Sequence, residues 1–281
     1  NILTYMAEWA DQTGMLVKQV EDEISVANMA LGSMYMGTRA LAATAGGGFD
    51  LMTETFSLAA ITETPLVIVV AQRPGPATGL PTWTGQGDLN LAVHAAHGEF
   101  TRLVVAISDP SDAFELVQHA FNYAEEFQIP VVILSEKQVG ETIWTTDEFE
   151  QGKVPIRRGL VEKAEGLKPE DRYEITESGI SRRWRPGLSA DAYYCANGDE
   201  HWLDGTVTED GEQAKAMYEK RIRKGVALEA ALPEPEVFGA SEGAQISFVG
   251  WGSSKRVMID VLKELEEAGV KANYLHYAYV W

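Results

Sequence analysis

Three features of this chain carry residue types that could do chemistry: an acid at a helix start, a run of three glycines, and an arginine in a long loop. The acid is Glu23, which stands where a short apolar stretch ends and an apolar helix begins. Ala27, Ala30 and Gly32 follow it, and such small residues let another group pack closely on the helix. An acid in this place is either a favourable charge at a helix N-terminus or a carboxylate held for catalysis. The spacing alone leaves both interpretations open.

The glycine run Gly46–Gly48 connects a strand of small residues to the helix that begins at Phe49. Glycines at a helix N-terminus can bind an anion, and they also let a flat ring approach the backbone. The run matches neither the Gly-Lys-Ser/Thr phosphate loop nor the Gly-x-Gly-x-x-Gly dinucleotide pattern. A purely structural turn is the alternative interpretation.

The arginine, Arg73, is the only cation in the proline- and glycine-rich stretch 71–84, which follows the apolar run Pro65–Ala71. In open α/β sheets, ligands bind just outside the carboxyl ends of the strands. A guanidinium fixed there suits a carboxylate, which it can bind through two hydrogen bonds. Thr78 and two later threonines of the loop add hydroxyl groups. The alternative is a surface arginine, but the rigid proline and glycine framing favours a functional role.

Alternating helix and strand patterns must position these three features. Helices are predicted over Ile2–Thr13, Glu23–Met36, Phe49–Thr62 and Ala113–Phe127, and strands over Met15–Val20, Ala40–Thr44, Pro65–Ala71, Leu103–Ile107 and Ile129–Leu134. Such alternation predicts an α/β fold with a parallel, doubly wound sheet.

The pattern breaks between residues 135 and 239, which predicts an extended linker with short turns. One long polar helix, Glu209–Ala231, interrupts it, and its charges pair at four-residue spacing (Glu219 with Arg223), as is typical of a solvated helix. A second α/β unit follows. Its elements are predicted as a strand over Gln245–Gly250, a helix over Lys255–Ala268 and a strand over Val270–Tyr279. We therefore divide the chain into residues 1–145, 146–240 and 241–281.

Composition limits the classes of partner and site. The net charge is 23 − 42 = −19, which argues against nucleic acid and anionic membranes as partners. No apolar run approaches the length of about 20 residues that a membrane helix needs. The single cysteine, Cys195, excludes a disulfide within the chain and an iron–sulfur cluster ligated by this chain alone. A reducing cytoplasm is the expected location.

Several segments in a fixed order carry a resemblance to one family. They are Glu21-Asp22-Glu23-Ile24-Ser25, Ala45-Gly46-Gly47-Gly48-Phe49-Asp50-Leu51-Met52-Thr53-Glu54, Thr62-Glu63-Thr64-Pro65, Gln72-Arg73-Pro74-Gly75-Pro76-Ala77-Thr78-Gly79-Leu80-Pro81-Thr82, Gln86-Gly87-Asp88-Leu89, His97-Gly98-Glu99-Phe100, Gln128-Ile129-Pro130-Val131, Tyr173-Glu174-Ile175-Thr176 and Val249-Gly250-Trp251-Gly252-Ser253. Together they resemble the alpha subunit of thiamine diphosphate-dependent 2-oxoacid:ferredoxin (2-oxoacid:acceptor) oxidoreductases over nearly the whole chain.

The resemblance implies a pyrimidine-binding thiamine diphosphate domain over residues 1–145, without its N-terminal part, and a truncated transketolase C-terminal-like α/β domain over residues 241–281. It also implies an oxidative decarboxylation in which a 2-oxoacid and coenzyme A become acyl-CoA and carbon dioxide, and electrons pass to ferredoxin. We expect 2-oxoglutarate to be preferred, with pyruvate or a branched-chain oxoacid as alternatives.

The resemblance also assigns residues and partners. It implies that Glu23 is the catalytic glutamate that activates the cofactor. Substrate would be bound by Arg73 and Thr78. The cofactor-binding residues it implies are Glu23, Thr44, Gly46, Gly47 and Phe49. No metal ligand is expected in this chain, because Mg²⁺ and the iron–sulfur cluster belong to a beta subunit in the family, and we expect the chain to be inactive without that subunit. A gamma domain or subunit is a further expected partner.

One departure keeps other functions open. The family carries a Tyr-Pro-x-Thr-Pro segment upstream of the first helix, and this chain starts after it, so the sequence is expected to be part of a longer one. A non-catalytic scaffold or regulatory subunit of such a complex is one alternative. Another transketolase-like thiamine enzyme is a second, although the phosphate-binding cations that sugar-phosphate enzymes need are not evident around Arg73.

Overall fold

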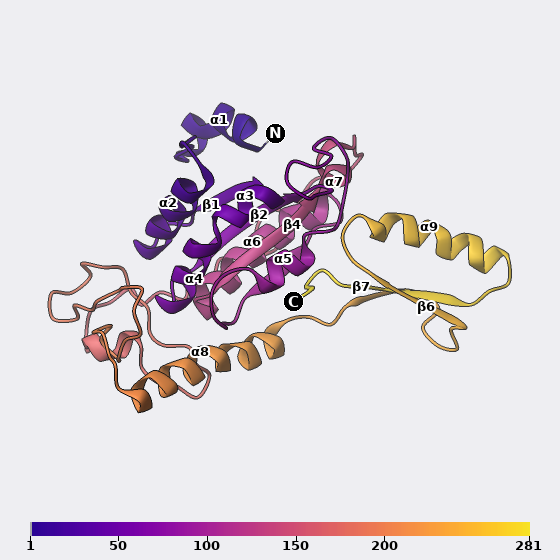
Figure 1. Ribbon diagram of the computed structural model, residues 1–281. Helices are drawn as coiled ribbons and strands as arrows, with labels where there is room; N and C mark the ends of the chain where they lie inside the picture. Colours follow the sequence, from indigo (N-terminus) through magenta and orange to yellow (C-terminus); the bar gives the residue numbers. More distant parts are fainter. Residues whose placement is uncertain (1) are drawn as a thin grey trace.

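The computed structural model describes residues 2–281 and arranges them around two β-sheets (Figure 1). The larger sheet has four parallel strands in the order β1-β2-β4-β3. They are β1 (Leu41–Ala45), β2 (Leu66–Gln72), β3 (Leu103–Ala106) and β4 (Pro130–Glu136). The two central strands are apolar, largely β-branched runs that are buried on both faces, which is why the sequence identifies them so clearly. The predicted parallel α/β fold is confirmed.

Helices cover both faces of this sheet. One face packs against α2 (Glu23–Tyr35), α3 (Gly46–Leu51), α4 (Thr53–Ile61) and α5 (Leu89–His94). The opposite face packs against α6 (Pro110–Phe127) and, through Leu228, against the end of α8 (Gly211–Ala231). Even-numbered residues of β2 face the first layer of helices and odd-numbered residues face the second, because side chains alternate along a strand.

The N-terminal part differs from the prediction. Helix α1 (Ile2–Thr13) forms as expected, but none of its residues is buried, and it lies at the edge of the molecule (Figure 1). The strand predicted for Met15–Val20 does not form: these residues pair with no other strand, and Leu16 is 82% exposed. A short apolar pattern makes a strand only where a neighbour completes its hydrogen bonds.

The helix predicted from Phe49 is two helices. The glycines Gly46–Gly48 form the first turn of α3, so they are helical rather than an irregular turn. Met52 ends α3 and begins α4. Helix α3 contacts β1 and β2, whereas α4 contacts α2 and β4.

The segment between residues 142 and 210 has little regular structure, as predicted, apart from a 3-10 turn at Pro169–Arg172 after the short helix α7 (Lys137–Glu141). It is nevertheless ordered around a core of its own. That core contains Leu167, Tyr173, Trp184, Ala192, Tyr194 and, from α8, Met217. The segment is therefore packed structure and not an extended linker.

Helix α8 corrects another prediction. The sequence predicts a solvated helix, but Lys220 and Lys224 are almost completely buried. Arg223 donates to the backbone oxygen of Thr176 at 3.2 Å, and the expected pair with Glu219 is absent from residues 2–281. The charged side chains of α8 bind residues far away in the sequence, and a four-residue spacing does not reveal such contacts.

The smaller sheet consists of β5 (Glu236–Gly239), β6 (Ile246–Gly250) and β7 (Ala272–His276) in the order β5-β7-β6. Strand β5 was not predicted; it runs antiparallel to β7 directly after the prolines that end α8. Helix α9 (Ser254–Glu267) packs on the sheet through Leu262.

The predicted strand Val270–Tyr279 is shorter, because the chain leaves the smaller sheet after His276 and returns to the larger one. There Val280 donates to the oxygen of Val104 at 2.9 Å, and Val104 donates to the oxygen of Trp281 at 2.8 Å. The last residues thus cover the outer edge of β3. Across residues 2–281, no helix has the length and apolar character to cross a bilayer.

Candidate active site

The three features of chemical interest all lie at the carboxyl-end rim of the larger sheet. Helix α3 starts directly after β1, and the loop that carries Arg73 starts at the end of β2. Because these strands are parallel, their carboxyl ends share one edge. Contacts join the two features there: a Cβ on Gly47 would lie 3.9 Å from the backbone oxygen of Ala77 in the loop.

Glu23 is the first residue of α2 and faces the end of β1. Asp22 caps the helix by accepting a hydrogen bond from the Ser25 N–H at 2.7 Å, which fixes where the helix begins. The Thr44 hydroxyl donates to Glu23 Oε1 across 3.4 Å. Within residues 2–281 this long contact is the one hydrogen bond to the Glu23 carboxylate, which is half-buried. The carboxylate therefore keeps acceptor positions free for a ligand.

Gly48, the last member of the predicted glycine run, is the glycine that permits this arrangement. A Cβ on Gly48 would overlap Thr44 Oγ1 and would lie 2.7 Å from Glu23 Oε1. A larger residue would therefore displace the carboxylate or the hydroxyl. The sequence predicts a role for the run Gly46–Gly48, but it does not indicate which of the three glycines contacts Glu23.

Gly46 and Phe49 have other surroundings. A Cβ on Gly46 would lie 2.8 and 2.9 Å from the two carboxylate oxygens of Asp88, so this glycine faces the loop rather than Glu23. The ring of Phe49 is fully buried and packs edge-on against Phe56, with 5.6 Å between ring centroids. Phe49 thus anchors α3 to the hydrophobic core.

Arg73 lies beside the Asp88 carboxylate at the base of the loop. The N–H of Asp88 donates to Gln72 Oε1 at 3.2 Å, which ties the two ends of the loop together. Burial and the nearby Asp50 carboxylate raise the pKa of Asp88, and the Arg73 N–H and guanidinium oppose this only in part. Arg73 Nε is buried and has no hydrogen-bond partner within residues 2–281. Such a group calls for a partner from outside the chain.

Thr78 lies apart from these contacts. It is exposed in the loop, and within residues 2–281 no hydrogen bond joins it to Glu23 or Arg73. A cavity of 820 Å³ also lies elsewhere, beside α4, Ala96–Phe100 and α8. No group of three His, Cys, Asp or Glu residues in the described part of the chain is placed to hold a metal ion.

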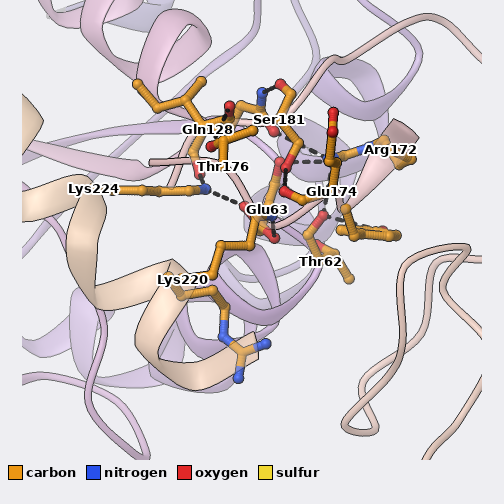
Figure 2. A network of polar contacts seen from close by, with 12 residues as sticks. Thr62, Glu63, Gln128, Arg172, Glu174, Thr176, Ser181, Lys220 and Lys224 are labelled. Carbon is orange, nitrogen blue, oxygen red and sulfur yellow. Dashed lines mark hydrogen bonds and ion pairs between the residues drawn. The ribbon is translucent and has the colours of Figure 1, made fainter. Parts of the chain in front are cut away.

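A second carboxylate, Glu63, lies at the amino-end side of the same sheet, between α4 and β2, and sequence reasoning gave it no role. It is fully buried, and Lys220 and Lys224 each approach one of its oxygens to 2.5 Å (Figure 2). Burial raises the pKa of Glu63, but the charges of Lys220, Lys224 and Arg172 outweigh it and hold that pKa far below its usual value. Arg172 also donates to the backbone oxygens of Thr62 and Glu63 at 3.0 and 2.9 Å.

Comparison with known proteins places this geometry in a family. Residues 1–194 match the family model described as pyruvate flavodoxin/ferredoxin oxidoreductase, thiamine diphosphate-binding. The 2-oxoacid:ferredoxin oxidoreductase subunit alpha of Saccharolobus solfataricus is 37% identical over 262 residues, which cover 92% of this chain and 41% of that protein. The 2-oxoglutarate synthase subunit KorA of Methanothermobacter marburgensis is 30% identical over 282 residues, covering 95% of this chain and 70% of that one.

Solved structures agree with this result. The 2-oxoglutarate:ferredoxin oxidoreductase of Magnetococcus marinus, solved with 2-oxoglutarate, coenzyme A and succinyl-CoA, matches with a TM-score of 0.90 and 32% identity over 100% of this chain and 48% of that one. A split-gene transketolase, at 13% identity and a TM-score of 0.52, shares the fold alone. The chain spans about two fifths of the length of several of these relatives. It belongs to the thiamine diphosphate-binding family of pyruvate flavodoxin/ferredoxin oxidoreductases, as its alpha-subunit relatives do.

Proposed function

We propose that this chain acts in the alpha subunit of a 2-oxoacid:ferredoxin oxidoreductase and supplies the residues that activate thiamine diphosphate and bind the 2-oxoacid. The observation that carries this proposal is the half-buried Glu23 carboxylate, which lies against Thr44 and Gly48 at the strand rim that also bears the Arg73 loop. The overall reaction is the coenzyme A-dependent oxidative decarboxylation of a 2-oxoacid to acyl-CoA and carbon dioxide, in which ferredoxin accepts the two electrons.

The residues present fit thiamine diphosphate. Glu23 has acceptor positions that no protein group of residues 2–281 uses, and the missing side chain of Gly48 lets the carboxylate and the Thr44 hydroxyl lie directly against α3. When bound, the cofactor supplies a nucleophilic carbon and an electron sink for decarboxylation. Glu23 would hold a proton at the ring nitrogen of the aminopyrimidine, and Thr44 would orient the carboxylate by its hydroxyl hydrogen bond. The backbone at Gly46 and Gly47 would line the ring site on the side of the Arg73 loop, and Phe49 anchors this turn in the core.

Arg73 would bind the carboxylate of the 2-oxoacid. Its buried Nε has no partner in the described chain, and a guanidinium can bind a carboxylate through two parallel hydrogen bonds. Thr78 lies exposed on the same loop and would contribute its hydroxyl as the substrate enters. We expect 2-oxoglutarate to be preferred, because KorA relatives are named 2-oxoglutarate synthase subunits and the Magnetococcus enzyme was solved with 2-oxoglutarate.

The remaining components belong to partners. A beta subunit would hold the diphosphate, Mg²⁺ and an iron–sulfur cluster, as the resemblance to the family implies. A gamma domain or subunit and ferredoxin complete the proposed cytoplasmic assembly. In it, residues 1–145 form the pyrimidine-binding domain, 146–240 the connection, and 241–281 the start of a transketolase C-terminal-like domain.

Turnover of the complex assembled with its beta subunit tests the proposal. Ferredoxin reduction is followed with 2-oxoglutarate, pyruvate and a branched-chain oxoacid, each with coenzyme A and thiamine diphosphate. We expect the highest kcat/KM for 2-oxoglutarate, and in Arg73→Gln a KM raised at least about tenfold, as the loss of a charged hydrogen bond predicts. Arg182→Gln, which removes an exposed arginine paired with Asp171, is the control and should leave KM unchanged. No turnover with any 2-oxoacid, or an unchanged KM in Arg73→Gln, would contradict the proposal.

A further inference from the structure

Glu136, the last residue of β4, is a buried carboxylate that the proposed chemistry does not use. Its side chain accepts hydrogen bonds from the Thr84 hydroxyl at 2.6 Å, from Gln86 Nε2 at 2.8 Å and from the Ser253 N–H at 3.1 Å. The residue is 4% exposed. These four residues, which we call the Glu136 junction, join the end of β4, the Arg73 loop and the turn between β6 and α9. A buried carboxylate that accepts three hydrogen bonds from neutral donors is well suited to fix the relative positions of these three segments.

The junction acts on the part of the loop that touches Arg73. Thr84 and Gln86 flank Gly85, and a Cβ on Gly85 would lie 3.0 Å from Pro74 N and 3.2 Å from the carbonyl carbon of Arg73. The backbone at Gly85 therefore runs so close to that of Arg73 and Pro74 that no side chain fits between them. Glu136 binds both neighbours of Gly85, so a shift of Glu136 would reach the Arg73 backbone through this close approach.

The same junction brings in the smaller sheet. Gln86 Nε2 donates to the backbone oxygen of Trp251 at 3.2 Å as well as to Glu136, so its amide cannot turn over without losing a bond. A Cβ on Gly252 would lie 2.7 Å from Gln86 Nε2, which shows how tightly the turn is seated. The side chain of Trp251 packs against the core of the larger sheet.

We infer that Glu136 is a positioning residue that sets the place of the Arg73 guanidinium through Thr84 and Gln86, and that it ties the substrate-binding loop to the β6–α9 turn. This inference rests on the proposed role of Arg73 in binding the 2-oxoacid carboxylate. It predicts that loss of Glu136 weakens substrate binding through Arg73 and leaves cofactor binding at Glu23 intact.

Glu136→Gln in the assembled complex tests this, because glutamine keeps the shape but turns an acceptor into a donor that faces other donors. We expect KM for 2-oxoglutarate to rise roughly tenfold, as the loss of a hydrogen bond to a charged group predicts, with kcat and thiamine diphosphate affinity changed less than about twofold. Thr84→Val, which removes one of the three donors, should give a smaller rise. Arg256→Gln is the matched control: it breaks the contact of α9 with Asp109, another contact between the two sheets, and should leave KM unchanged.

Two further measurements separate positioning from general weakening. In the Arg73→Gln background, Glu136→Gln should no longer change KM, because a residue that acts through Arg73 has nothing left to position. Hydrogen exchange of residues 73–88 should accelerate in Glu136→Gln and stay unchanged in Arg256→Gln.

A KM rise that persists without Arg73, or unchanged exchange in this loop, would overturn the inference. A wild-type complex without turnover would contradict the proposed function alone, because the exchange measurement still decides whether Glu136 orders the loop.

Discussion

Two glutamates at opposite ends of the same sheet have opposite surroundings. Glu23, at the carboxyl-end rim, is half-buried and has one long hydrogen bond, from Thr44. Glu63, at the amino end, is fully buried and surrounded by Lys220, Lys224 and Arg172 (Figure 2). A carboxylate buried among three cations stabilises the fold and leaves no room for a ligand. A carboxylate with positions to spare is available for a ligand, and this difference separates the candidate site from the supporting structure.

The Glu63 cluster also explains how a segment without regular structure is held in place. Arg172 comes from the irregular segment, and both lysines come from α8, so one buried acid fastens two distant parts of the chain to the sheet. Glu125 does the same on α6, where it pairs with Arg39, Arg158 and Arg183. Buried charges tolerate this placement only when they are fully paired.

The largest effect on stability is expected for Glu63→Gln. This substitution tests whether Glu63 and its cations stabilise the fold. It leaves buried cations without a counter-charge, and the free energy of unfolding should fall by about 3–5 kcal/mol. Urea unfolding followed by circular dichroism measures it. Lys263→Gln, which removes an exposed partner of Asp260, is the control and should change stability by less than about 0.5 kcal/mol. An equally small change in Glu63→Gln would show that the cluster does not stabilise the fold.

The next largest effect is expected for Gly48→Ala. This substitution tests whether turnover depends on the placement of Glu23 beside Thr44. The new Cβ would displace Glu23 or Thr44, and an error of this size in a catalytic group lowers kcat/KM by about 100-fold. Steady-state turnover of the assembled complex and titration with thiamine diphosphate measure the effect.

Gly32→Ala is the matched control for this substitution. Gly32 lies on α2 with open space around it, so alanine should stabilise the helix by about 0.5–1 kcal/mol and leave turnover unchanged. Equal activity of Gly48→Ala and Gly32→Ala would mean that catalysis does not depend on the close approach of Gly48 to Glu23.

The smallest effect is expected in the pH dependence of stability. Burial lowers the pKa of Lys220 from 10.5 to about 7 against the opposing charge of Glu63. Between these two values the unfolded chain binds more protons at this residue than the folded chain, so Lys220 makes the free energy of unfolding rise with pH. Lys220→Met should therefore flatten the pH dependence of stability between pH 7 and 9.5. A slope identical to that of the wild type would contradict a buried, destabilised ammonium group at this position.

The regular part of the fold was predictable from particular residues. The apolar runs of β2 and β4 and the Asp109-Pro110 helix start are local signals, and the structure has these elements within one to three residues of the predicted bounds. The strand predicted at Met15–Val20 fails because a strand needs a partner, and a sequence window does not contain one.

Long-range contacts were not predictable. Lys220 lies 157 residues from Glu63, so the sequence of α8 predicts a solvated helix although Lys220 and Lys224 are buried. The place of Gly46–Gly48 and Arg73 on one rim follows from the parallel topology. The place of Glu23 does not, because the strand predicted before it does not form. The contact of Gly48 with Glu23, and that of Gly46 with Asp88, depends on how α2 and the loop pack, which no spacing encodes.

The most direct test compares Glu23→Gln with Glu63→Gln in the assembled complex, measuring turnover per folded complex and the free energy of unfolding on the same samples. We predict that Glu23→Gln lowers kcat by about 10²–10⁴-fold, as the loss of a general acid–base group does, and keeps the stability of the wild type. Glu63→Gln should lose stability and keep turnover per folded complex. Full turnover in a stable, assembled Glu23→Gln complex would contradict the account.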